Sequence, residues 1–302
     1  MKFTADCGPC LMRRVLFQSR LAGTGLEFEA VKAAAGVLSE RMDPGTDSVR
    51  VATEVHRAAY AAVRSEDPYA EIKARADEAA APVARELEAI VSASDDPFRA
   101  AVMGAVAGNI MDFGVGSAID DPSAFASVYE GIVAQGLGVD DVAELEAAVR
   151  GSPGVVYMFD NCGESMLDAV LIGVIRRMGK RVVGVARGAP ILNDVTAGDA
   201  ARSGLDSKLD RLLTTGKFFV GIDWDDVPPE LSEEISACGL IIAKGMANYE
   251  ATSGRDPPVP LAHILRTKCG PVASSLGVPQ NVNVVKLIRP ARWEPWASSK
   301  QS

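Results

Sequence analysis

From residue 154 onward, short apolar runs alternate with helical segments, and this alternation limits the fold more than any other feature. The run from Val155 to Phe159 is too short for a helix and predicts a buried strand. The segment that follows, 164–174, has apolar residues at helical spacing. Further strands are expected at 181–186, 212–214, 240–243, 272–273 and 282–288, with helices at about 197–203 and 229–237. Repeated β-then-α units predict an α/β fold with a mainly parallel sheet flanked by helices.

The first part of the chain has a different pattern. Residues 1–100 carry apolar positions at helical spacing and predict an all-helical N-terminal subdomain, followed by an α/β domain over 101–302. Pro82 is expected to kink or divide a helix that covers about 71–91. Asn109 and Asp112 are three residues apart and are expected to share one helix face.

Composition excludes several classes of protein. Of the 302 residues, 48% are apolar, enough for a sizeable core, and the net charge of −9 argues against nucleic-acid binding. No apolar run approaches the ~20 residues of a membrane span, and the first residues lack the apolar region of a signal peptide. Five cysteines, an odd count, favour reduced thiols. We therefore expect a soluble cytoplasmic protein with no nucleic-acid or membrane partner, and the sequence does not indicate its oligomeric state.

Polar residues follow the predicted strands closely. Asp160, Asn161, Arg187, Thr215 and Lys244 each come within about two residues of a strand end. Parallel strands bring such ends to one edge of the sheet, where ligands of open α/β sheets bind. Carboxylate and amide oxygens suit a hard divalent cation, and a lysine suits phosphoryl oxygens. The pattern therefore predicts a metal and phosphate site. The two histidines, His56 and His263, lie outside these turns and are expected to be packing or surface residues.

The segment Cys7-Gly8-Pro9-Cys10 matches the thioredoxin tetrapeptide. A redox pair of this kind normally follows a strand, and here only six residues precede it. A structural pair or half of a metal site is the preferred interpretation, since Pro9 in a first helical turn also explains the spacing. Cys7, Cys10 and Cys269 would meet if the N-terminal helix packs near the last strands.

Each candidate also has a plainer interpretation. Asp160 and Asn161, and likewise Asn193 and Asp194, could cap the helices that follow them. Asn109 and Asp112 could form a buried hydrogen-bonded pair. Lys244 could be a solvated loop residue, and Lys268 could belong to a strand edge. The joint occurrence of these residues favours a site over a series of independent coincidences.

Seven motifs occur in order along nearly the whole chain. They are Cys7-x-x-Cys10, Asp67-Pro68-Tyr69, Gly108-Asn109-x-x-Asp112, Asp160-Asn161-x-Gly163-Glu164, Pro190-Ile191-Leu192-Asn193-Asp194, Lys244-Gly245-x-x-Asn248-Tyr249-Glu250 and Lys268-Cys269. In this order the chain resembles the metal-dependent damage-control phosphatases, the domain-of-unknown-function 89 family. The CxxC-containing prokaryotic branch is the most similar.

The resemblance implies a helical N-terminal part packed on a Rossmann-like α/β part. It implies hydrolysis of small phosphate monoesters such as sugar phosphates, with a divalent cation (Mn²⁺, Mg²⁺, Co²⁺ or Ni²⁺). The implied metal ligands are Asp160, Asn161 and Asp194. The implied catalytic residues are Asp160, Lys244 and Lys268. The implied substrate contacts are Asn109, Asp112, Glu164 and Asn248.

Several alternatives stay open at this point. Asp160 could bind only the metal, or it could attack phosphorus and form an aspartyl phosphate. The chain could bind a phosphorylated metabolite without turnover, or it could be a thiol redox protein that uses Cys7 and Cys10. A carboxyl methyltransferase activity has also been proposed within the family that the chain resembles.

Overall fold

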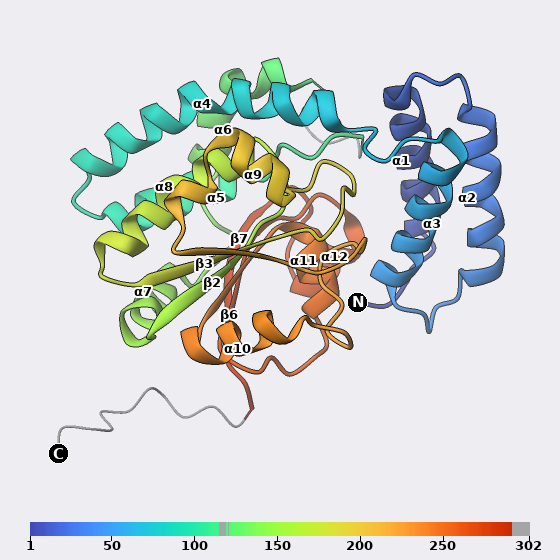
Figure 1. Cartoon of the computed structure of the whole chain (residues 1–302). Helices are drawn as coiled ribbons and strands as arrows, with labels where there is room; N and C mark the ends of the chain where they lie inside the picture. Colours follow the sequence, from blue (N-terminus) through green and yellow to red (C-terminus); the bar gives the residue numbers. More distant parts are fainter. Residues whose placement is uncertain (115–118, 120, 292–302) are drawn as a thin grey trace.

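A seven-stranded sheet forms the centre of the described structure (Figure 1). The computed structural model describes residues 1–114, 119 and 121–291. The strands are β1 Val139–Asp140, β2 Gly154–Met158, β3 Arg181–Ala186, β4 Arg211–Thr214, β5 Ile241–Lys244, β6 Leu261–Arg266 and β7 Asn283–Ile288. β2 and β5 are buried along their whole length, which explains their continuous apolar runs.

The strand order is β1-β7-β6-β5-β2-β3-β4. All neighbouring strands are parallel except β6 and β7, which are antiparallel. The chain adds β3 and β4 on one side of β2 and then returns to place β5 on the other side. The direction of winding therefore reverses between β2 and β5, and the carboxyl ends of these two strands flank the crevice where such folds bind ligands. The predicted α/β class with a mainly parallel sheet is confirmed.

Helices lie on both sides of this sheet (Figure 1). In chain order they are α1 Cys7–Ala22, α2 Glu27–Arg41, α3 Ser48–Val63, α4 Ala70–Ala93, α5 Pro97–Gly108, α6 Phe125–Ala134, α7 Val142–Gly151, α8 Glu164–Arg177, α9 Ala197–Ser203, α10 Pro229–Cys238, α11 Gly245–Thr252 and α12 Gly270–Leu276. Helices α4, α5 and α8 stack together on one side, and α10 lies on the opposite side. The bundle α1–α3 stands beside the sheet.

The described part of the chain has two main apolar cores. One core is confined to the bundle and includes Leu11, Val15, Leu38 and Val55. The other joins the sheet to α4, α5 and α8, and contains most of the buried residues. Helix α4 therefore packs with the α/β part, and the expected boundary at residue 100 does not coincide with a change of core. Residues 292–302 of the expected second domain lie outside the described residues.

Two local predictions are wrong, and a third is wrong in part. Residues 272–273, expected in a strand, lie inside α12, and the last sheet-forming pair is instead β6 and β7. Of the two effects expected of Pro82, a kink or a division, the division is wrong, because α4 is one continuous helix. Helix α5 ends at Gly108, so Asn109 and Asp112 do not share a helix face. Helix α3 begins at Ser48, where the side chain of Asp47 accepts a hydrogen bond from the Val49 N–H.

No helix in the described ranges has the length and apolar content that a bilayer span requires.

Candidate functional site

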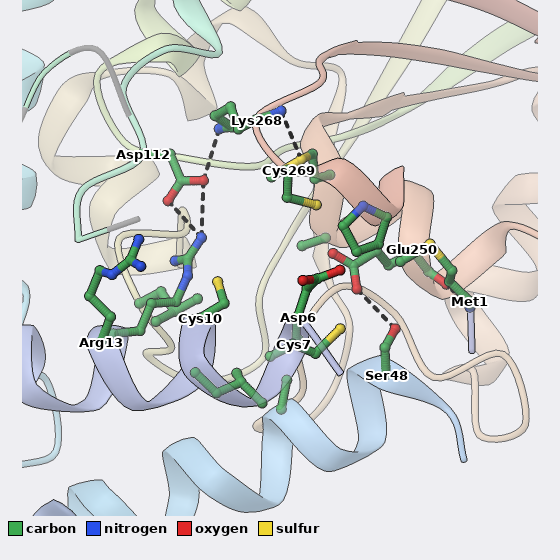
Figure 2. Close-up of a pocket in the computed structure, with 18 of the residues that line it drawn as sticks. Met1, Asp6, Cys7, Cys10, Arg13, Ser48, Asp112, Glu250, Lys268 and Cys269 are labelled. Carbon is green, nitrogen blue, oxygen red and sulfur yellow. Dashed lines mark hydrogen bonds and ion pairs between the residues drawn. The ribbon is translucent and has the colours of Figure 1, made fainter. Parts of the chain in front are cut away.

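A pocket of about 460 Å³ opens at the carboxyl ends of the parallel strands. Five of the predicted site residues line it, namely Asp112, Asp160, Asn161, Asp194 and Lys268. Helix α1 supplies another part of the wall, with Cys7, Cys10 and Arg14. Figure 2 shows Asp112 and Lys268 facing this helix across the pocket. The site is therefore assembled from the strand edge and from the bundle that stands beside it.

The three predicted metal ligands lie together. Asp160 and Asn161 follow β2, and Asn161 pairs with Asp194 in an isolated antiparallel bridge. Arg187, which follows β3, joins the two carboxylates: its Nε donates to Asp194 Oδ2 at 2.6 Å and its Nη2 lies 3.4 Å from Asp160 Oδ1. The two aspartates therefore point toward one position, although they are far apart in the sequence.

A glycine makes room for Asp160. Gly245 directly follows β5 and has φ of +74°, a conformation that favours glycine. A Cβ atom at this position would lie 1.7 Å from Asp160 Oδ2. The ends of β2 and β5 can thus approach each other only because residue 245 has no side chain.

Behind Asp160 lies a second group of polar residues. Asn109 Nδ2 donates to Glu164 Oε2 at 2.7 Å and to Asp160 Oδ2 at 3.2 Å. Asn161 Nδ2 donates to the same two oxygens, at 3.0 and 2.9 Å respectively. Asn109 and Glu164 are fully buried and do not line the pocket. They were predicted as substrate contacts, and the structure places them instead as supports for the Asp160 carboxylate.

Lys244 lies deeper still. Its Nζ donates to Asp168 Oδ1 at 2.6 Å, to the Ala105 carbonyl oxygen at 2.9 Å and to Glu164 Oε1 at 3.2 Å. The side chain is fully buried and does not line the pocket, so it is not placed to touch a substrate as its predicted catalytic role requires. Two buried carboxylates hold the ammonium group beneath the site, and Lys244 positions Glu164.

Asn248 also differs from its predicted role as a substrate contact. Its Nδ2 donates to the carbonyl oxygens of Phe159 and Lys244, at 3.0 and 2.7 Å, and its Oδ1 accepts from Arg187 Nη1 at 3.0 Å. The residue is fully buried in the first turns of α11. It fixes Arg187 against the ends of β2 and β5.

Arg14, Asp112 and Lys268 form a cationic wall of the pocket. Lys268 Nζ lies 2.8 Å from Asp112 Oδ2, and Arg14 Nη2 donates to the same oxygen at 3.1 Å. Burial favours the neutral acid, but Arg14 and Lys268 outweigh this effect and lower the pKa of Asp112 to about 2. Two cations thus share one carboxylate, leaving net positive charge on this wall. Arg14 was not among the predicted site residues, because it lies in a helix and follows no strand end.

The electrostatics of Asp160 and Asp194 favour a bound cation. Burial raises the pKa of Asp160 well above its usual range, and the carboxylates of Asp194 and Glu164 raise it further. Burial also raises the pKa of Asp194, against the opposing effect of Arg187. In the described part of the chain, no three His, Cys, Asp or Glu side chains are grouped as a metal site. Asp160, Asn161 and Asp194 offer carboxylate and amide oxygens at this position, a donor set whose chemistry fits a hard divalent cation such as Mg²⁺ or Mn²⁺.

The fold and the pocket define an α/β protein with a ligand site at the reversal point of its sheet. Comparison with known proteins gives a more specific assignment. The damage-control phosphatase ARMT1-like domain matches residues 3–284. A damage-control phosphatase of Archaeoglobus fulgidus is 36% identical over 290 residues, which cover 95% of this chain and 100% of that protein. A damage-control phosphatase of Pyrococcus horikoshii is 29% identical and covers 94% of this chain and 97% of its own length.

A solved structure agrees with these relatives. The crystal structure of a domain-of-unknown-function 89 protein from Pyrococcus horikoshii superposes with a TM-score of 0.82 at 28% identity, covering 96% of this chain and 99% of that one. The chain belongs to the damage-control phosphatase family, as its motifs predicted.

Proposed function

We propose that this protein is a metal-dependent phosphatase that hydrolyses small phosphate monoesters, such as sugar phosphates or damaged phosphometabolites. Its family supports phosphatase activity. The observation that carries the finer proposal is the convergence of Asp160, Asn161 and Asp194 with Lys268 in one pocket. The pocket, at about 460 Å³, has the size of sites for small metabolites.

Asp160, Asn161 and Asp194 would hold the metal. A divalent cation bound there supplies positive charge that offsets developing charge on the phosphoryl oxygens. The other residues have separate tasks in this proposal. Arg187 holds the two aspartates in a common orientation, and Asn109 keeps the Asp160 carboxylate from rotating.

The phosphoryl group itself would bind against Lys268 and Arg14. Both residues line the pocket, and Asp112 already aligns them side by side. Prealigned cations lower the cost of reorganisation when charge develops on the phosphoryl oxygens. Arg14 Nη1 is buried and has no hydrogen-bond partner among the described residues, so a phosphoryl oxygen would supply the acceptor that it lacks.

Release of free phosphate from p-nitrophenyl phosphate and fructose 1-phosphate tests the proposal, with Mn²⁺, Co²⁺, Ni²⁺ or Mg²⁺ added to chelator-treated protein. We expect turnover only with added metal. Asp160→Asn and Asp194→Asn should each lose ~10²-fold or more in kcat/KM, because each removes both charge and geometry from the site. Asp95→Asn is the matched control, since Asp95 is exposed in the loop before α5.

Near-normal metal-dependent turnover by Asp160→Asn would overturn the assignment of the site. Binding of these esters by the wild-type protein, with no phosphate released under any metal, would show a binding protein instead of an enzyme.

A further inference from the structure

Three thiols share the pocket with the proposed phosphatase site. Cys7 and Cys10 come from α1, and Cys269 comes from the residue before α12. All three are free and partly exposed. Figure 2 shows their sulfur atoms on the wall of the pocket, between the cationic wall and the end formed by Ser48 and Glu250. None of the steps proposed for phosphate hydrolysis uses a thiol.

Cys7 and Cys10 lie in the first turn of α1, three residues apart. Residues at this spacing lie on the same face of a helix with Cβ atoms ~5–6 Å apart, whereas a disulfide needs ~3.5–4.5 Å. A small adjustment of the first turn closes this difference. The N-cap residue, Asp6, makes no side-chain capping bond, so that no such bond opposes the adjustment.

The other cysteines are less suited to exchange. Cys162 and Cys238 are each 1% exposed, and burial raises the pKa of both thiols. Burial also raises the pKa of Cys269 to about 12, with a further contribution from the Glu250 carboxylate, so Cys269 stays protonated and is a poor nucleophile. The pair in α1 is the accessible dithiol of the described chain.

We propose that Cys7 and Cys10 form a reversible disulfide on the pocket wall, and that this disulfide lowers the phosphatase activity. The oxidant is a low-molecular-weight disulfide. One thiolate attacks it, forming a mixed disulfide and releasing one small thiol. The second cysteine, as its thiolate, then displaces the second small thiol. The protein loses two electrons and two protons, and the oxidant gains them as two thiols.

The disulfide reaches the active site through α1. Arg14 lies one turn after Cys10 on the same helix face, and its guanidinium lies 3.1 Å from Asp112, the carboxylate that also binds Lys268. Adjustment of the first turn displaces this face relative to the strand edge. Displacements of about 1 Å at a catalytic site can cost up to ~10²-fold in rate, and we expect a loss of about tenfold here.

The experiment uses the full-length protein loaded with metal, treated with oxidised glutathione and afterwards with a phosphine reductant. Peptide mass mapping should find a Cys7–Cys10 bond in the oxidised wild type and in Cys269→Ser, but not in Cys7→Ser or Cys10→Ser. Hydrolysis of p-nitrophenyl phosphate by the wild type should fall about tenfold in kcat/KM on oxidation and return on reduction. The double variant Cys7→Ser/Cys10→Ser, which can form neither the mixed disulfide nor the internal one, should have equal kcat/KM before and after oxidation.

The mapping result does not depend on the proposed phosphatase function, whereas the activity result rests on it. Absence of the Cys7–Cys10 bond would overturn the proposal, and so would a bond that leaves kcat/KM unchanged. An equal loss of activity in the double variant Cys7→Ser/Cys10→Ser would assign the effect to another group and would also overturn the proposal. If the reduced protein hydrolyses no phosphate ester, the proposed function fails while the mapping still tests the disulfide.

Discussion

Gly245 is the residue on which the approach of β2 and β5 depends. Replacing it by alanine would place a Cβ atom 1.7 Å from Asp160 Oδ2, so the carboxylate must move away from Asp194. We expect Gly245→Ala to lose ~10²-fold in kcat/KM for p-nitrophenyl phosphate, because a carboxylate displaced by about 1 Å no longer has productive geometry.

The control for this substitution is Gly277→Ala. Gly277 has a similar φ, +70°, but a Cβ atom there meets nothing within 4 Å. Gly277→Ala therefore introduces the backbone strain of about 1 kcal/mol without a contact with Asp160. Equal activity in the two variants would show that the clash does not matter for the site.

Lys244 should contribute to stability more than its position at a strand end suggests. Its ammonium group is the cation between Glu164 and Asp168, and all three side chains are fully buried. Lys244→Met leaves two buried carboxylates without their cation, and we expect a loss of ~3–5 kcal/mol in the free energy of unfolding. Urea unfolding measures this value. Lys208→Met, at an exposed position, should change it by no more than ~0.5 kcal/mol, and similar losses in both variants would contradict the prediction.

Among the elements, α1 has a double role. Its apolar side packs in the core of the bundle, and its other side presents Arg14 to the pocket. Arg14→Gln removes a cation from the wall that we propose binds the phosphoryl group. We expect kcat/KM to fall about 10²-fold. Arg20→Gln lies on the exposed side of the same helix and should keep its activity, and a fall in Arg20→Gln equal to that in Arg14→Gln would refute a local role.

The elements were predictable where a local pattern determines them. The prediction of 181–186 gave the bounds of β3 correctly, because an apolar run between turn residues is characteristic of a buried strand. β6 was missed because His263 and Arg266 interrupt its apolar pattern. Residues 272–273 were assigned to a strand although Pro271 signals the start of a helix, and this signal decides the structure.

The sequence predicted which edge of the sheet carries the site, but not which of the predicted side chains reach the pocket. A polar residue after a parallel strand lies at the carboxyl edge, which is why the strand pattern indicated Asp160. Asp194 follows no strand directly and was expected only from the family resemblance. Whether a side chain enters the pocket or lies beneath it depends on tertiary packing. Lys268 lines the pocket, whereas Lys244 is fully buried beneath it. The contribution of Arg14 depends on how the bundle docks, and no local pattern encodes that.

Across the whole molecule, both histidines are buried in a neutral form, one in each main part of the chain. His56 lies on α3 and accepts or donates a hydrogen bond with Gln18, while His263 lies on β6. Burial, together with a smaller effect of Arg14 on His56 and of Lys286 on His263, lowers the pKa of each ring to about 3. Both were expected to be packing or surface residues, and their burial shows that both are packing residues.

His263 makes the folded state sensitive to mild acid. The folded pKa of about 3 is below the value of about 6.5 in the unfolded chain, so between these values the unfolded chain binds more protons. The stability that the neutral ring provides is therefore present above pH ~6.5 and is lost as pH falls below it. Protonation would place a charge beside Tyr249 and Thr252, where Nδ1 has no hydrogen-bond partner among the described residues.

His263→Leu removes this titration. From about pH 7 to about pH 5, the stability of the wild type relative to this variant should fall by about 2 kcal/mol, as measured by urea unfolding at both values. The comparison uses the difference in stability between wild type and variant, because other buried groups also titrate in this range. Burial raises the pKa of Asp168 to about 6, for example, which gives the opposite pH dependence, and this contribution is the same in both proteins and cancels in the difference. Ile264→Val, a neighbouring buried substitution without a titrating group, should show the same difference from wild type at both pH values. A wild-type advantage over His263→Leu that does not change with pH would mean that the ring is not held neutral by burial.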